Sequence, residues 1–211
     1  MDIKVFSALQ TYADTHSSEE SEARKYIIQA THSELQYADM LSGKQVAGLL
    51  RLLIQTGGYT RILEVGMFTG YATTAMAEVM PDNGHITTLE MNTLYAGIAK
   101  RGFKMAGLQD KITVIMGSAR ETVLQLSETY DLIFLDADKQ WYPEYLRVLK
   151  PKLKSGGLLV ADNVFWYGGV LENKDRKSQA INTFNKMLQQ DNEMEVVMLG
   201  IRDGLSIARK R

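Results

Sequence analysis

The stretch DADK, residues 136–139, places two carboxylates and an ammonium directly after the apolar run LIFL, residues 132–135. A second polar pair, Asp162 and Asn163, follows the apolar segment GGLLVA, residues 156–161. Carboxylate and amide oxygens are the ligands that hard cations such as Mg²⁺ prefer. If the two segments are neighbouring strands, Asp136, Asp162 and Asn163 form a cation site. The alternative is that each aspartate only caps the helix after it.

Lys139 stands three residues after Asp136. Beside a cation-bound hydroxyl, a lysine whose pKa is lowered by the cation and by burial can act as a general base. A solvated loop lysine is the alternative. Trp141, Trp166 and Tyr167 lie close in sequence to the same loops and could form the wall of a site for an aromatic molecule, or belong to the core.

A second constellation is EVGMFTGY, residues 64–71. Its glycines, Gly66 and Gly70, are spaced G-x-x-x-G, so the G-x-G-x-x-G pattern of a dinucleotide site is absent. Glu64 would repel a diphosphate but would suit a cationic cofactor without phosphate, such as S-adenosylmethionine (SAM). Glu90, 24 residues after Gly66, is placed to bind ribose hydroxyls. A purely structural turn after a strand is the alternative.

The residues that carry this chemistry must be held by regular elements. Short apolar runs predict strands, and periodic segments between them predict helices. The expected strands are 61–66, 85–90, 112–116, 131–136, 156–162, 195–200 and 205–210. The expected helices lie within 1–40 and at 44–56, 71–80, 93–107, 120–128, 143–153 and 174–191, with Ser17 and Glu20 as a possible capping box.

The alternation of strands and helices predicts an α/β fold with a doubly wound, mostly parallel sheet. The segment IRDG between the last two strands is a hairpin signal that adds an antiparallel edge. Ligands of such sheets bind beyond the carboxyl ends of the strands, where the polar residues above lie. We expect one domain, residues 1–211, with a helical N-terminal extension (1–43) and a Rossmann-like core (44–211).

Composition narrows the function. The 211 residues carry 24 basic and 25 acidic side chains, a net charge of −1, which does not favour nucleic acid or an anionic membrane as partner. No cysteine occurs, which excludes thiolate catalysis and fits a reducing cytoplasm. The N-terminus has no signal-peptide pattern, and the three histidines have no metal-ligand spacing. A cytoplasmic protein is expected.

Three segments resemble the cation-dependent O-methyltransferases, which include bacterial catechol methyltransferase-like and plant caffeoyl-coenzyme A enzymes. They are ILEVGMFTGYATTAMAE (62–78), YDLIFLDADKQWYPEY (130–145) and GGLLVADNVFWYGGV (156–170). The likeness runs from about Val46 to the C-terminus. It implies a class I methyltransferase fold with a seven-stranded sheet, SAM as cofactor and a divalent cation: Mg²⁺, Mn²⁺ or Ca²⁺.

The resemblance also implies roles for single residues. SAM would be bound by Glu64, Gly66, Glu90, Ala119 and Asp136, and the cation by Asp136, Asp162 and Asn163. Lys139 matches the catalytic lysine of animal catechol methyltransferase, and Asp138 and Trp166 match substrate-facing positions. Ala72 stands where related sequences often have a serine near the methionine carboxylate, a role that Thr73 or backbone amides could take.

The predicted reaction is methyl transfer from SAM to a hydroxyl of a catechol-type small molecule, with Lys139 as base. A nicotinamide-dependent oxidoreductase and a non-catalytic binding protein on the same fold are the alternatives. We expect a homodimer, in which the helices of residues 1–40 serve as a dimer contact or as a lid. Lys174, Arg176 and Lys177 either clamp coenzyme A or begin a solvated helix.

Overall fold

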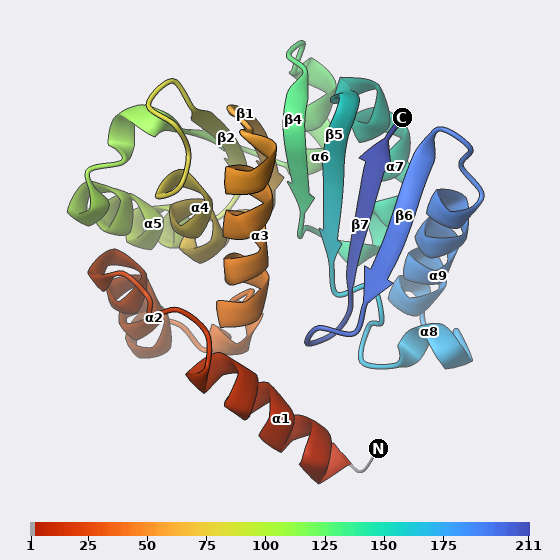
Figure 1. Cartoon of the computed structure of the whole chain (residues 1–211), viewed down its shortest axis with the longest axis horizontal. Helices are drawn as coiled ribbons and strands as arrows, with labels where there is room; N and C mark the ends of the chain where they lie inside the picture. The colour runs from red at the N-terminus through yellow and green to blue at the C-terminus, as the bar shows by residue number, and fades with distance from the viewer. Residues whose placement is uncertain (1–2) are drawn as a thin grey trace.

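A seven-stranded sheet in the order β3-β2-β1-β4-β5-β7-β6 runs through the middle of the molecule (Figure 1). The computed structural model describes the backbone of residues 3–211 and the side chains of residues 5 and 7–211. The strands are β1 (Arg61–Val65), β2 (His85–Glu90), β3 (Ile112–Met116), β4 (Tyr130–Leu135), β5 (Leu153–Asp162), β6 (Met194–Leu199) and β7 (Leu205–Lys210). β1 to β5 are parallel, and β7 pairs antiparallel with both β5 and β6.

Helices cover both faces of the sheet (Figure 1). One face packs against α3 (Lys44–Gly57), α4 (Tyr71–Ala77) and α5 (Thr93–Ala106) around an apolar cluster that includes Leu50 and Met76. The other face packs against α6 (Ala119–Gln125), α7 (Tyr142–Leu149) and α9 (Arg176–Gln189), around a cluster that includes Phe184. The short helix α8 (Gly169–Glu172) precedes α9. This two-sided burial explains why the central strands are nearly continuous apolar runs.

The predicted α/β fold with a doubly wound, mostly parallel seven-stranded sheet is confirmed. Each of the seven expected strands is present, with ends that differ by at most three residues from the prediction. β4 and β5 are neighbours, so the polar residues after each strand meet at one edge of the sheet. The division of the chain into one domain with an extension and a core stays a prediction.

The N-terminal segment forms two helices. α1 (Ile3–Thr15) extends away from the body, and α2 (Glu22–Glu34) packs beside α4 and α5 (Figure 1). The expected capping box of Ser17 and Glu20 is wrong: Ser21 is the N-cap, and its Oγ accepts from Arg24 N–H at 3.2 Å. Ser21 also donates to Glu78, the C-cap residue that follows α4, so the cap is placed by a contact distant in sequence. No helix described in the structure has the length and apolarity needed to cross a membrane.

Candidate active site

A cleft of about 1690 Å³ lies at the carboxyl ends of the parallel strands. Most residues with a predicted role line it: Gly66, Glu90, Ala119, Asp136, Asp138, Lys139, Asp162, Asn163 and Trp166. Glu64, Ala72 and Thr73 do not line it. The cleft has two halves, one at the ends of β1 and β2 and the other at the ends of β4 and β5.

Gly66 lies where the two halves meet. Its φ of +99° falls in the region that glycine adopts freely, and a Cβ here would come within 2.2 Å of the Asp136 carbonyl oxygen. Asp136 N–H also donates to Val65 O at 2.9 Å. Only glycine therefore permits this approach between the residues that follow β1 and β4.

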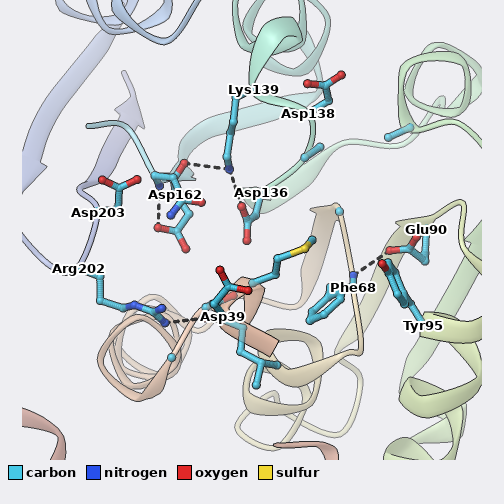
Figure 2. A pocket seen from close by; sticks show the side chains of 18 of the residues that line it. Asp39, Phe68, Glu90, Tyr95, Asp136, Asp138, Lys139, Asp162, Arg202 and Asp203 are labelled. Carbon is cyan, nitrogen blue, oxygen red and sulfur yellow. Dashed lines mark hydrogen bonds and ion pairs between the residues drawn. The ribbon is translucent and has the colours of Figure 1, made fainter. Parts of the chain in front are cut away.

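Glu90 is held by backbone amides. Its Oε2 accepts from Phe68 N–H at 2.9 Å (Figure 2). Its Oε1 accepts from Met91 and Asn92 N–H at 2.8 and 2.7 Å. Burial raises the pKa of Glu90, and the three N–H donors oppose that shift. The Tyr95 ring stands edge-on to Phe68, with centroids 4.8 Å apart, and both residues line this half of the cleft.

Glu64 lies behind the cleft wall. It is fully buried, and its Oε2 accepts from the hydroxyls of Thr73 and Thr88, each at 2.5 Å. Its Oε1 has no hydrogen-bond partner among residues 3–211. Burial raises the pKa of Glu64 to about 8. Thr73 and its buried neighbour Ala72 are part of α4, so the three residues support the wall from the side of the core.

The β4–β5 half gathers the predicted cation ligands. Asp136 follows β4, Asp162 ends β5, and Asn163 comes next with a left-handed φ of +58°. Asp162 is 3% exposed, and its Oδ1 accepts from Asn163 N–H at 2.7 Å. Burial, followed by the negative charge of Asp136, raises the pKa of Asp162. Asn163 holds a backbone conformation that is rare outside glycine, as is common at functional sites.

Lys139 joins the two strand ends. Its buried ammonium donates to Asp136 Oδ1 at 2.6 Å and to the Asp162 carbonyl at 3.3 Å (Figure 2). It also donates to the Tyr142 hydroxyl at 2.7 Å. The Tyr142 hydroxyl is 2.8 Å from the Asp162 carbonyl and can donate to it. Burial raises the pKa of Tyr142 well above its usual value. Tyr142 is thus a site residue that sequence reasoning missed, although it lies only three residues after Lys139.

Loops form the remaining walls of the cleft. Asp138 is exposed, accepts from Gln140 N–H at 3.2 Å, and directs its carboxylate away from Asp136 in Figure 2. Trp166 and Tyr167 line the cleft with left-handed φ angles of +49° and +51°. Trp141 does not line it.

Several charged residues that were not predicted also line the cleft, among them Asp39, Arg202 and Asp203. Asp39 belongs to a short 3-10 helix, and the other two lie in the turn between β6 and β7. The hairpin signal IRDG located that turn in the sequence, but it gave no sign that the turn reaches the cleft.

The basic residues at the start of α9 behave differently from one another. Lys174 pairs with Glu172 at 2.6 Å, and Arg176 is exposed; neither lines the cleft. Lys177 lines it, with its Nζ 5.1 Å from the centre of the Trp166 ring. The helix start is therefore mainly solvated, and one lysine reaches the site.

The donor set fits a divalent cation. Among the described residues no three His, Cys, Asp or Glu side chains gather to hold a metal, and the expected set offers two carboxylates and one amide instead. Asp136 and Asp162 are close enough that the charge of Asp136 disfavours ionisation of Asp162. The Lys139 ammonium donates both to the Asp136 carboxylate and to the Asp162 carbonyl. Two neighbouring carboxylates with an amide oxygen are ligands of the kind that Mg²⁺ or Mn²⁺ binds.

Comparison with known proteins agrees with this architecture. The model of the O-methyltransferase family matches residues 14–211. The chain is 35% identical to a catechol O-methyltransferase of Niastella koreensis over 170 residues, covering 75% of this chain and 77% of the relative. It is 29% identical to probable caffeoyl-CoA O-methyltransferase 1 of Dictyostelium discoideum over 219 residues, covering 99% and 95%.

Solved structures show the same fold. The O-methyltransferase from Bacillus cereus, crystallised with S-adenosylhomocysteine (SAH), superimposes with a TM-score of 0.89 and 26% identity, covering 100% of both chains. These findings favour a methyltransferase over a nicotinamide-dependent oxidoreductase. The predicted class of enzyme, a SAM-dependent O-methyltransferase, is confirmed. The chain belongs to the O-methyltransferase family.

Proposed function

We propose that this enzyme transfers the methyl group of SAM to one hydroxyl of a small vicinal dihydroxy aromatic, with the help of a divalent cation. The observation that carries the proposal is the meeting of Asp136, Asp162 and Asn163 in one cleft with Gly66 and Glu90. The names of the Niastella and Dictyostelium relatives support a phenolic acceptor.

The β1–β2 half would hold SAM. Glu90 is fixed by three N–H donors and can accept from ribose hydroxyls with its remaining lone pairs. Gly66 leaves room for the cofactor beside the backbone of Asp136, and Ala119, which begins α6, lines the same cleft. SAM would supply a methyl group on a sulfonium. Because SAM carries no phosphate, the Glu90 carboxylate would not repel it.

The β4–β5 half would hold the cation through Asp136, Asp162 and Asn163. A bound divalent cation would balance the two carboxylates and lower the pKa of a phenolic hydroxyl. The resulting charge is close to neutral, so the site does not repel the sulfonium. The walls that include Trp166 would keep the aromatic ring against the cofactor and exclude water. Most of the acceleration would come from holding the two reactants in attack geometry.

Lys139 would accept the phenolic proton at Nζ. Its ammonium now pairs with Asp136, with Nζ 2.6 Å from Oδ1. A cation that shares the Asp136 carboxylate would weaken this pairing, so that the nitrogen can act as base toward the acceptor hydroxyl. Tyr142 and the Asp162 carbonyl keep Nζ at the strand ends throughout.

The test is a mass-spectrometric screen of methyl transfer to a catechol panel with Mg²⁺, Mn²⁺ or Ca²⁺, and after exhaustive chelation with EDTA. We expect methylated catechols only when a cation is present. If none of the catechols is methylated, the proposed class of acceptor is wrong. Full turnover after chelation would contradict the cation site.

Calorimetric titration of Mg²⁺ or Mn²⁺ into the wild type and Asp162→Asn, without acceptor, tests the cation site independently of activity. The homodimer and the cytoplasmic location stay predictions.

A further inference from the structure

The turn between β6 and β7, residues 201–204, contacts both loop walls of the cleft. On one side the Arg202 guanidinium donates to Leu41 O at 2.7 Å. On the other side Phe165 N–H donates to Asp203 O at 2.9 Å, and Tyr167 N–H donates to Asp203 Oδ1 at 2.7 Å. Asp203 is therefore held firmly, because its carbonyl and one carboxylate oxygen are both used by the loop that follows Asp162.

The other carboxylate oxygen of Asp203 has no such use. Oδ2 is buried and has no hydrogen-bond partner among residues 3–211. Asp203 nevertheless lines the cleft, as Asp162 and Arg202 do (Figure 2). A buried carboxylate oxygen without a donor is costly, so an occupant of the cleft that supplies a donor gains an interaction which the protein alone lacks.

The neighbouring cations do not meet this need. The Lys139 ammonium has its three hydrogen-bond partners in Asp136, Tyr142 and the Asp162 carbonyl. The Nη1 of Arg202 is directed to Leu41 O. Burial raises the pKa of Asp203, and the Tyr167 N–H and the charges of Lys139 and Arg202 oppose that shift, yet neither cation binds Oδ2. An ionised carboxylate only accepts hydrogen bonds, so the missing partner is a donor.

We propose that Asp203 determines acceptor specificity: its Oδ2 accepts a hydrogen bond from a donor group of the bound methyl acceptor that is not one of the two vicinal oxygens. The preferred acceptors are then catechols with a third hydroxyl or an ammonium. This inference rests on the proposed function, and it narrows the substrate class of the same cleft. A site with an unpaired buried acceptor disfavours an analogue that lacks the donor, and we expect a preference of roughly 10–100-fold in kcat/KM.

The experiment compares matched acceptors that differ only in the donor: pyrogallol with 3-methoxycatechol, and hydroxyquinol with 4-methoxycatechol. Catechol is the reference, and dopamine tests an ammonium. Asp203→Asn is the informative variant, because its amide oxygen can still accept from Tyr167 N–H while an NH₂ donor replaces Oδ2. We expect the wild type to prefer the donor-bearing member of at least one pair. In Asp203→Asn that preference should vanish or invert, with the rate on catechol changed much less.

Affinities measured by calorimetry with SAH and Mg²⁺ present should follow the same order without turnover. Asp82→Asn, the same charge change at an exposed site, should leave the preference intact. An equal loss on every acceptor in Asp203→Asn would overturn the inference, because Asp203 would then only hold the loop. An unchanged preference would also overturn it, since a water molecule would then satisfy Oδ2.

The wild type alone provides a test if Asp203→Asn does not fold. Absence of any preference between the paired acceptors overturns the inference without a variant. Failure of the proposed function gives a different result, because then no catechol is methylated at all.

Discussion

Glu90 and Asp162 are both buried carboxylates at strand ends of one cleft, but they are stabilised in different ways. Glu90 accepts from three backbone N–H groups. Asp162 accepts from one, and the charges of Lys139 and Arg202 give it further support. Backbone donors are fixed by the loop, whereas charged side chains can share their charge with a bound ion. In the proposed function, the β2 end therefore binds a neutral polyol, and the β4–β5 end binds a cation beside the Lys139 ammonium.

The strongest way to break this contrast is to remove Asp162. In Asp162→Ala we expect methyl transfer to fall by about 10³-fold or more, because a cation contributes several kcal/mol of transition-state stabilisation. The melting temperature without added metal should not fall much, since Asp162 is buried at a cost and its pKa is raised. Steady-state kinetics and thermal unfolding check both. A collapse of stability together with activity would show that Asp162 mainly supports the fold, and Asp82→Ala is the exposed control.

A substitution of Lys139 tests whether the nitrogen that lies between the two strand ends also accepts a proton. Lys139→Met should lower kcat by about 10²–10⁴-fold and leave SAM affinity nearly unchanged. The loss should shrink for a nitro-substituted catechol, whose hydroxyl ionises without help. Kinetics across a series of catechols of graded acidity measure this. Equal losses across the series would mean that Lys139 only positions the acceptor. Tyr142→Phe, which removes one contact of Nζ and keeps the amine, is the matched control.

Glu64 adds a third case to the comparison of Glu90 with Asp162. It is a buried carboxylate whose hydrogen-bond donors are the hydroxyls of Thr73 and Thr88. Its folded pKa, about 8, lies above the ordinary 4.5, so the folded protein binds this proton more tightly than the unfolded chain does. Its contribution to stability is complete below pH 4.5 and is lost as the pH rises through 8. Glu64→Gln should therefore gain stability relative to the wild type between pH 5 and pH 9, by a few kcal/mol.

Thermal or urea unfolding of the ligand-free protein at several pH values measures the Glu64 effect. Glu195→Gln, on the exposed side of β6, is the control and should show no such trend. A constant difference between Glu64→Gln and the wild type at all pH values would show that Glu64 titrates normally in the folded protein.

The smallest expected effect is at Glu90. Glu90→Ala should weaken SAM binding by about 1–3 kcal/mol through the loss of charge-assisted hydrogen bonds to the ribose. Glu90→Gln keeps one side-chain oxygen as acceptor for the backbone N–H groups. It therefore separates the effect of losing the charge from the effect of disturbing the loop conformation. Calorimetric titration with SAM measures both variants. An unchanged dissociation constant in Glu90→Ala would mean that another residue holds the ribose.

The sequence was sufficient to predict which residues lie at the strand ends. It was not sufficient to predict the side-chain contacts between one strand end and the next. Asp136 and Asp162 could be located because each ends a continuous apolar run, and parallel strands end at one edge of a sheet. Glu64 could not be placed from its nearness to Gly66. It lies within β1, where side chains alternate, and it shares the face of Ile62 that packs under α4.

Tyr142 and Asp203 were missed for a related reason. Nothing local distinguishes the Tyr142 hydroxyl from that of any core tyrosine until α7 brings it to the Asp162 carbonyl. Asp203 reads as a turn residue, and its role depends on contacts with Phe165 and Tyr167, about 40 residues earlier in the chain. Such contacts are fixed by the packing of distant segments, which local patterns do not record.

The close approach at Gly66 limits how this enzyme can diversify. No side chain separates the backbone after β1 from the backbone after β4 at Gly66, so main-chain atoms set the spacing between the β1–β2 half and the β4–β5 half there. Mutation cannot adjust that spacing gradually, because the smallest available change already adds a Cβ. New acceptors can therefore be accommodated only by altering the loops around Trp166, Leu41 and Asp203, while the reacting centre is inherited unchanged.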